Sequence, residues 1–328
     1  MMKKIEMMKG AKKLVDECTK VKEGENVLII TDTVTPLSIA EVLAMACKER
    51  GAEAVIAIMS PNPSEGEQND PPPPVMEAMQ KAQVIFAVGS RSIFHSSSRA
   101  KAIKAGVRYF GFSEVTEEYM YRGAIEANFL EAKEFLRKVG DALRKAKEAR
   151  VTTPAGTDLY LDFRGRPEKV LELNAISHQP GDTGGIILEA AISPKVGSAQ
   201  GVLVCDACVT LFKPGIIKEP IRATIKNGMV TEISGGAEAR RLSDLLAGMG
   251  DPMVYNVSEL GIGVNPKAKI TGAKTQDKGV YGTCHFGFGS NITWGGEIKA
   301  ATHFDLQVYA PKIELDGLTI LENYKFNL

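Results

Sequence analysis

Two of the four histidines in this 328-residue chain lie in one glycine-rich stretch near its C-terminal end, "GTCHFGFGSNITWGGEIKAATHFDL" (282–306). One of them, His303, is followed two positions later by Asp305 in "THFDL". Side chains two apart on a strand share a face, with Cα atoms about 6.6 Å apart. A metal ion with bonds of about 2 Å can accept one ligand from each of these residues.

Two further polar residues extend this pair into a candidate metal-ligand set. His285 lies in "CHFGFG", where glycines permit close approach of the backbone, and Glu259 lies in the similar segment "SELGIGVNP". Mixed nitrogen and oxygen donors suit Zn, Mn, Co or Fe(II) better than a thiolate site would. The alternative is that these are hydrogen-bonded polar residues at hairpin ends, since no H-E-x-x-H pattern is present. The candidate ligands are Glu259, His285, His303 and Asp305.

The other two histidines are candidates for proton transfer. His95, in "SRSIFHSSSRA", follows a predicted strand at the carboxyl end of a parallel sheet, where open α/β folds bind ligands. There it would act as a general base or polarising group, or else be an ordinary polar residue at a helix start. His178, in "AISHQPGD", is a second candidate or a plain loop residue. The lone "CDAC" (205–208) lacks the second pair that a structural zinc site needs, so buried small residues are the simpler interpretation.

Composition and absent motifs exclude several functions. Equal counts of 40 basic and 40 acidic residues leave no net charge to favour nucleic acid or an anionic membrane. The chain contains no G-x-G-x-x-G after a strand, no G-x-x-x-x-G-K-[ST] and no G-x-S-x-G, which disfavours nucleotide cofactors and serine-hydrolase chemistry. There is no signal-peptide pattern and no apolar run of about 18 residues. Because five cysteines do not make a disulfide framework in a chain of this size, we expect a cytoplasmic protein.

The first 150 residues alternate short apolar runs, typical of buried strands, with segments of helical spacing. The strand-like runs are 26–32, 52–60, 83–90 and 108–114. The helical segments are 36–51, 69–82 and 130–149. This alternation predicts an α/β, Rossmann-like domain over residues 1–150, with a parallel sheet covered by helices on both faces.

From residue 151 to residue 328 the pattern changes to polar and apolar alternation with glycine turns. The dipeptides Asn-Gly at 227–228 and Asp-Gly at 316–317 are strong hairpin signals. One helix is expected, over 238–248. The sequence therefore predicts a β-rich (α+β) second domain that carries the candidate metal ligands.

Four segments in this order, "TTPAGTDLYLDFRGR", "SELGIGVNP", "HFGFGSN" and "THFDL", resemble the aminopeptidase T (thermophilic leucyl aminopeptidase) metallopeptidase family. That family includes a branch of 2,5-dihydroxypyridine dioxygenases, and the likeness covers most of the chain. The resemblance implies a metal site in the second domain, facing the cleft between domains, and a homo-oligomer. By position, Glu259, His285, His303 and Asp305 match the metal-binding motifs of the family.

One segment departs from the peptidase pattern. The peptidases bind two metals and use a further glutamate from a Pro-x-Gly-Glu-Val type segment. The corresponding stretch here is "QPGDTGGIIL" (179–188), where Gly185 stands in place of that glutamate. Asp182 and Glu189 are the candidate substitutes, and the chain is also short for a peptidase.

Three functions follow from the resemblance. The favoured one is a hydrolase resembling a leucyl aminopeptidase, in which one or two Zn, Mn or Co ions activate water to attack an amide of a short peptide or small molecule. The alternative is a mononuclear Fe(II) dioxygenase that cleaves a 2,5-dihydroxypyridine-like ring. Two histidines and one carboxylate would then hold the iron, and His95 and His178 would accept protons. The third is a non-catalytic binding protein on the same fold.

Overall fold

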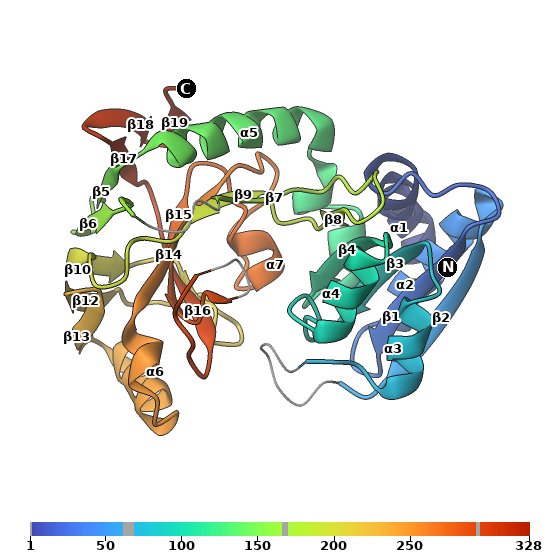
Figure 1. The fold of residues 1–328 in the computed structure, drawn as a ribbon, viewed down its shortest axis with the longest axis horizontal. Helices are drawn as coiled ribbons and strands as arrows, with labels where there is room; N and C mark the ends of the chain where they lie inside the picture. The colour runs from blue at the N-terminus through green and yellow to red at the C-terminus, as the bar shows by residue number, and fades with distance from the viewer. Residues whose placement is uncertain (1, 62–68, 166–169, 293–295) are drawn as a thin grey trace. The chain divides into compact units, whose positions relative to one another are not determined.

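The computed structural model describes residues 2–61, 69–165, 170–292 and 296–328. The chain forms two compact units (Figure 1). The first comprises Met1–Lys133 and Leu173–Ile187, and the second comprises Glu134–Glu172 and Leu188–Leu328. The predicted domains, 1–150 and 151–328, differ from these units in two segments. Residues 134–150 group with the second unit, and residues 173–187 group with the first.

The first unit is built on a parallel sheet with the strand order β2-β1-β3-β4-β8. The strands are β1 (Asn26–Asp32), β2 (Glu53–Met59), β3 (Val84–Gly89), β4 (Arg108–Ser113) and β8 (Thr183–Gly184). The first four correspond to the four apolar runs of the sequence, which are apolar because a central parallel strand is covered on both faces. Strand β8 was not predicted, because two residues carry no periodicity.

Helices cover both faces of this sheet. They are α1 (Met2–Lys12), the π-helical turn η1 (Lys13–Cys18), α2 (Leu37–Glu49), α3 (Pro73–Met79) and α4 (Ser97–Lys104). The crossover from β1 to β2 runs in the opposite direction to the next two crossovers, so right-handed connections place α2 on one face and α3 and α4 on the other. Met79 of α3 and Ala102 of α4 pack into one buried cluster with Ile30 and Ile85 of the sheet. The predicted α/β fold is confirmed for this unit.

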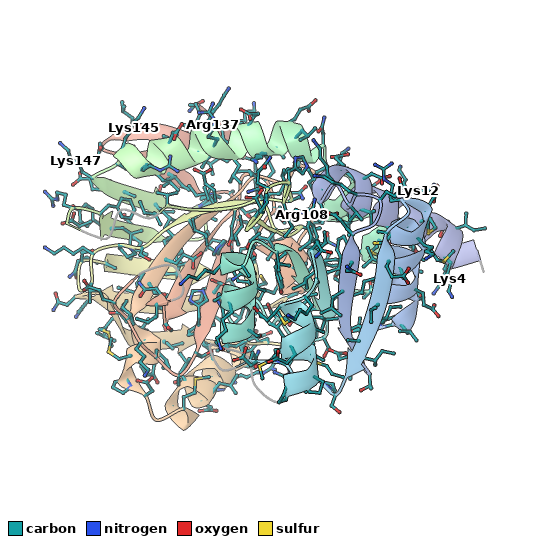
Figure 2. The ribbon with its side chains drawn as sticks, turned by 45° about the vertical axis from the view of Figure 1, so that its right-hand side comes forward. Lys4, Lys12, Arg108, Arg137, Lys145 and Lys147 are labelled. Carbon is teal, nitrogen blue, oxygen red and sulfur yellow. The ribbon has the colours of Figure 1, made fainter. Side chains whose placement is uncertain are left out.

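Arg108, the first residue of β4, anchors the chain segment that precedes β1. Its guanidinium donates hydrogen bonds to the carbonyl oxygens of residues 19–20, at 2.8 and 3.0 Å, and pairs with Glu25. The Arg108 side chain is 5% exposed and lies within the unit, whereas Lys4 and Lys12 lie at its surface (Figure 2). A charge this deeply buried is tolerated because each contact partner is an oxygen acceptor.

The second unit contains two antiparallel sheets, as the alternating pattern predicted. The larger has the order β13-β12-β10-β6-β5-β17-β18-β19. Its strands are β5 (Glu148–Thr152), β6 (Asp158–Asp162), β10 (Gln200–Cys205), β12 (Ile221–Lys226), β13 (Met229–Gly235), β17 (Lys312–Leu315), β18 (Leu318–Glu322) and β19 (Lys325–Phe326). Both hairpin predictions are confirmed, since the turns at 227–228 and 316–317 have positive φ at both residues and join paired strands.

The smaller sheet, with the order β11-β16-β15-β14-β9-β7, carries the candidate ligands. Its strands are β7 (Val170–Leu173), β9 (Glu189–Ile192), β11 (Cys208–Val209), β14 (Val257–Gly263), β15 (Cys284–Gly289) and β16 (His303–Val308). The helices are α5 (Phe129–Lys145), which begins in the first unit, α6 (Ala237–Gly248) and α7 (Lys274–Asp277). Single 3₁₀ turns are η2 (Glu117–Met120) and η3 (Gly123–Glu126) in the first unit and η4 (Pro252–Tyr255) in the second. Of these, α5 and α6 were predicted and the four-residue α7 was not.

The structure bears on two expectations from the sequence, one about membrane-spanning segments and one about the cysteines. Within the described ranges no helix is long and apolar enough to cross a bilayer. All five cysteines are buried free thiols, and Cys205 and Cys208 of "CDAC" contact the backbone and side-chain oxygens of Gln307. The cytoplasmic location and the homo-oligomer stay predictions.

Candidate metal centre

The four predicted ligands project from one face of the smaller sheet of the second unit. The antiparallel register pairs Glu259 with Gly287, Gly287 with Asp305, and Gly289 with His303. Directly paired residues point to the same face, so residues 259, 261 and 263 of β14 share one face with the odd-numbered residues of β15 and β16. A register shift after Val257 pairs that residue with Phe288, on the other face. The opposite face is apolar and buried, and consists of Leu260, Ile262, Cys284, Phe286, Phe288, Phe304 and Leu306. The alternation in the sequence therefore separates a polar face from an apolar core.

Glycines in neighbouring strands make room for these side chains. A Cβ atom at Gly261 would lie 2.0 Å from Nε2 of His285. A Cβ atom at Gly287 would lie 2.7 Å from both Cβ of Glu259 and Cε1 of His303. The glycines of "SELGIG" and "CHFGFG" are thus required because polar side chains from adjacent strands lie across them.

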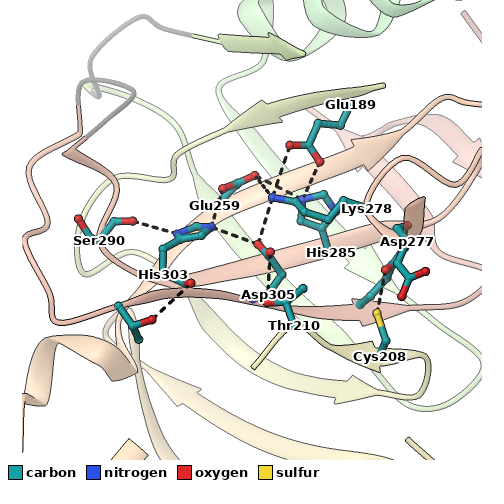
Figure 3. Close-up of polar contacts among 12 residues, drawn as sticks. Glu189, Cys208, Thr210, Glu259, Asp277, Lys278, His285, Ser290, His303 and Asp305 are labelled. Atoms are coloured by element: carbon teal, nitrogen blue, oxygen red, sulfur yellow. Dashed lines mark hydrogen bonds and ion pairs between the residues drawn. The ribbon is translucent and has the colours of Figure 1, made fainter. Parts of the chain in front are cut away.

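His303 and Asp305 converge with Glu259, as Figure 3 shows. Nε2 of His303 lies 3.2 Å from Oδ1 of Asp305 and 3.3 Å from Oε2 of Glu259. One donor atom from each of the three lies within 4.8 Å of the others. The three donors are therefore close enough for one ion to bind all of them.

A second group of donors shares Glu259 with the first. Nε2 of His285 lies 3.3 Å from Oε1 of Glu259 and 3.3 Å from Oε2 of Glu189. These three residues also have donor atoms within 4.8 Å of one another, and all three are buried. Glu259 thus links two potential cation positions.

The glutamate that supplements the predicted set is Glu189, the first residue of β9. The resemblance had aligned Gly185 with the expected glutamate, but Gly185 lies in the first unit, where a Cβ would approach the carbonyl oxygen of Gly111 to 2.8 Å. Asp182 accepts hydrogen bonds from the backbone amides of residues 178–179 and so stabilises a turn. Of the two candidate substitutes, Glu189 is the one that contacts predicted ligands, because Gly263 and Glu189 pair directly in the sheet.

Lys278 is the residue of this centre that the sequence did not indicate. Its ammonium lies 3.4 Å from Oε1 of Glu189, 3.4 Å from Oδ1 of Asp305 and 3.7 Å from Oε1 of Glu259 (Figure 3). Its side chain is only 6% exposed. Lysine is among the residues least often buried, so neither its type nor its position just after the short α7 helix suggested an internal role.

Burial raises the pKa values of the three carboxylates, and the Lys278 ammonium lowers them. Burial raises the pKa of Glu189, and the nearby carboxylates add to this rise. Burial also favours a higher pKa for Glu259 and Asp305, but Lys278 and the histidine contacts outweigh it and hold both pKa values below the usual range. Burial lowers the pKa of Lys278 itself, but the three carboxylates outweigh that effect and keep it above its usual value. Lys278 is therefore a permanent cation at neutral pH.

The His303 ring is held in one orientation by the backbone. Its Nδ1 donates a hydrogen bond to the carbonyl oxygen of Ser290 at 2.9 Å, so Nε2 faces the carboxylates. Burial lowers the pKa of His303, but Asp305 and Glu259 outweigh it and raise the pKa to about 9. A proton on Nε2 thus occupies the position that a metal ion would take. Metal-bound histidines in proteins are oriented in the same way, through the ring nitrogen that does not bind the metal.

Unsatisfied polar atoms test whether this centre fits a metal. Both carboxylate oxygens of Glu189, Oε2 of Glu259 and Nδ1 of His285 are buried without a hydrogen-bond partner among the described residues. The carboxylate oxygens among them have only longer ion-pair contacts, at 3.3 to 3.4 Å, with Lys278, His285 and His303. Buried carboxylate oxygens without hydrogen bonds are costly, and a cation beside them compensates this cost, as a divalent ion at Glu259 would. The oxygen and imidazole donors fit the predicted Zn, Mn, Co or Fe(II). Around His303 the group has one histidine and two carboxylates, so a two-histidine, one-carboxylate set would have to include His285.

His95 and His178 both lie in the first unit, His95 at the carboxyl ends of the parallel strands and His178 at their amino ends. His95 lies in the turn between β3 and α4, at the carboxyl edge as predicted, with its ring edge-on to Phe94 at 5.1 Å. His178 lines a pocket with residues 80–83 and 105–108, which precede β3 and β4. Its Nε2 donates a hydrogen bond to the carbonyl oxygen of Glu17 at 2.7 Å. The observed contact of His178 is thus a structural one, with the backbone.

We expect Gly287→Ala to weaken metal binding by about 10- to 100-fold, because the new methyl group would displace both Glu259 and His303. Competition with a chromogenic chelator measures the Kd for Mn(II) or Co(II). Gly248→Ala is the matched control, since a Cβ at Gly248 meets nothing within 4 Å. Equal affinity of the Gly287→Ala variant and the wild type would contradict the placement of these ligands.

We expect metal binding to release about one proton per chain near pH 7, because the metal must displace the proton on Nε2 of His303. The pKa of about 9 means that the metal-free imidazole is charged below that pH and neutral above it. Proton release should therefore fall by more than half near pH 9.5. Anaerobic calorimetric titration with Mn(II), in buffers of different ionisation enthalpy, measures the number. The same release at both pH values would show that His303 is not the displaced group.

Comparison with known proteins gives matches along nearly the whole chain. A family model described as 2,5-dihydroxypyridine 5,6-dioxygenase matches residues 6–327. A 2,5-dihydroxypyridine 5,6-dioxygenase of Pseudomonas putida is 28% identical over 262 residues, which cover 74% of this chain and 71% of that protein.

Two solved structures share the fold. The structure of 2,5-dihydroxypyridine dioxygenase from Pseudomonas putida matches with a TM-score of 0.83 and 20% identity, covering 98% of this chain and 97% of the other. Wild-type AmpT from Thermus thermophilus, an aminopeptidase T, matches with a TM-score of 0.71 and 14% identity, covering 99% of this chain and all of the other. At these identities the structural matches establish the α/β and β-rich fold alone.

Proposed function

This chain belongs to the 2,5-dihydroxypyridine 5,6-dioxygenase family, and from that premise we propose that it is a metal-dependent dioxygenase that cleaves a dihydroxylated nitrogen-heteroaromatic ring. The resemblance to the aminopeptidase T family, with its dioxygenase branch, is confirmed. The preference for a hydrolase is not retained, because the family model and the relative of 28% identity support the dioxygenase alternative and AmpT shares only the fold. The observation that carries the proposal is the convergence of buried carboxylate and imidazole donors in a chain of this family.

Three residues would hold the metal: Glu259, His303 and Asp305. A bound Fe(II) would supply the redox chemistry that couples an aromatic ring to O₂. The protein orients the side chains that would bind the metal. The Ser290 carbonyl fixes the His303 ring, and the Thr210 hydroxyl accepts a hydrogen bond from the Asp305 amide at 2.8 Å. These contacts keep the donor atoms in place before the metal arrives.

The side chains of the centre differ in their exposure to solvent, and the exposed side is where we propose that substrate binds. The His303 side chain is 15% exposed, whereas Glu189, Glu259, His285 and Asp305 are buried. Glu259, His303 and Asp305 would therefore hold an ion that a substrate can approach past His303.

We retain His95 as the proposed acceptor of a substrate hydroxyl proton. It lies at the carboxyl edge of the parallel strands, where folds of this class bind ligands. The ring of His178 donates to the Glu17 carbonyl at the amino edge, so we do not propose a proton-transfer role for it.

A hydrolase remains the second candidate because two donor groups share Glu259. A carboxylate that bridges two ions is typical of two-metal hydrolytic sites. The position of Lys278 beside all three carboxylates disfavours this arrangement, since it supplies a positive charge without a second ion.

The metal-free protein, reconstituted anaerobically with Fe(II), should consume O₂ and bleach the ring absorbance of 2,5-dihydroxypyridine in equal amounts. Reconstitution with Zn(II) should leave this activity absent, because Zn(II) has no redox chemistry. Hydrolysis of a leucine anilide with Zn(II), Mn(II) or Co(II), without O₂ uptake, would overturn the proposal in favour of the second candidate. Neither activity with any of these metals would leave only a binding protein on this fold.

In the same assay, His95→Ala should lower kcat by about 100-fold or more, as loss of a general base does, while iron content is unchanged. His178→Ala is the matched comparison. It should lower the melting temperature and leave kcat nearly unchanged. Unchanged kcat in the His95→Ala variant would remove His95 from the mechanism.

A further inference from the structure

We propose that the ammonium of Lys278 takes the place of a second divalent cation, so that this centre binds one metal ion and not two. The inference rests on the proposed function only in requiring that the centre binds a metal. It assigns to Lys278 the role of a tethered cation, which fixes the number of ions.

The position of the ammonium supports this role. A second ion would bind in the group formed by Glu189, Glu259 and His285, the only described donors that lie together beside the first group. The Lys278 ammonium already lies 3.4 Å from Oε1 of Glu189 and 3.7 Å from Oε1 of Glu259. The ammonium and a second ion would therefore compete for the same two carboxylates.

The balance of charge in the centre is an independent reason to expect a single metal ion. The buried carboxylates of Glu189, Glu259 and Asp305 carry three negative charges when ionised. Lys278 and one divalent ion balance these charges completely, with both histidines neutral. A second divalent ion beside Lys278 would leave two uncompensated positive charges in a buried site, which is strongly unfavourable.

The environment of each group indicates which one holds the ion. The group around His303 contains a partly exposed side chain, so an ion held by Glu259, His303 and Asp305 would be accessible to other ligands. The side chains of Glu189, Glu259 and His285 are themselves buried, at 1% exposure or less, and Lys278 provides the positive charge of that group. The ammonium also contacts Oδ1 of Asp305, so it lies between the two groups.

Hydrogen bonds to the chain around Lys278 hold it in this position. The Asp277 carboxylate accepts hydrogen bonds from the amides of residues 271–272 at 2.6 and 2.8 Å. The Asp277 carbonyl accepts a hydrogen bond from the side-chain amide of Gln307, on the polar face of β16. The lysine therefore enters the centre from a point attached to the same sheet as the metal ligands.

Metal stoichiometry tests the proposal without any activity assay. Protein saturated with Mn(II) and passed through a desalting column should retain one ion per chain in the wild type and in Lys278→Arg, which keeps the charge. Lys278→Met removes the charge at similar length and should retain two ions. The second ion should also produce the electron paramagnetic resonance spectrum of a coupled Mn(II) pair. One ion in Lys278→Met, or two in the wild type, would overturn the proposal.

A second variant keeps the test decisive if Lys278→Met does not fold. Glu189→Gln removes a carboxylate that pairs with Lys278 but does not bind the single ion, so it should retain one ion per chain. Retention of no ion in this variant would show that Glu189 is a metal ligand and would overturn the proposal. No ion in the wild type is a different failure, because it would remove the metal centre itself and with it the proposed function.

Discussion

The burial of three carboxylates on one face of a sheet is the constraint on which this centre depends. Taking a carboxylate out of water costs several kcal/mol per ion, even after the protein relaxes. A unit positive charge at about 4 Å returns about 4 kcal/mol at an effective dielectric constant near 20. Glu189, Glu259 and Asp305 are therefore tolerable only because cations lie among them, and the chain itself supplies one through Lys278. His303 supplies a second positive charge when protonated, and a metal ion supplies two when it replaces that proton.

The surrounding structure serves this arrangement at several levels. Alternation in β14, β15 and β16 separates the polar residues from the apolar core formed by Leu260, Phe286 and Phe304. Glycines at 261 and 287 leave space above neighbouring strands for an imidazole and a carboxylate to converge. The same sequence feature, a glycine-rich strand with polar residues at alternate positions, thus determines both the packing of the sheet and the geometry of the donors.

Much of this could be predicted from the sequence, because it depends on local patterns. The four strands of the parallel sheet, the two hairpin turns and the shared face of His303 and Asp305 follow from periodicity and turn chemistry over a few residues. The convergence of Glu259 and His285 with that pair was suggested by glycine context and family resemblance, and the structure brings all four together. The strand, turn and shared-face predictions needed no knowledge of how distant strands pair, whereas the convergence of Glu259 and His285 with that pair rested on glycine context and the family resemblance.

The parts that could not be predicted depend on pairing between distant segments. The sequence left Glu189 and Asp182 as alternatives. Glu189 reaches the centre because β9 pairs with β14, about 70 residues later in the chain, and no local pattern encodes that register. Lys278 follows a helix of only four residues, too short to show periodicity, and tertiary structure alone brings it between the carboxylates. Anomalous diffraction at the absorption edge of the bound metal tests this centre most directly. We expect one peak, bonded to Glu259, His303 and Asp305 at about 2.0–2.2 Å, with the Lys278 ammonium still beside Glu189. A metal-loaded crystal with no peak at these three residues, or with a peak where the ammonium lies, would contradict it.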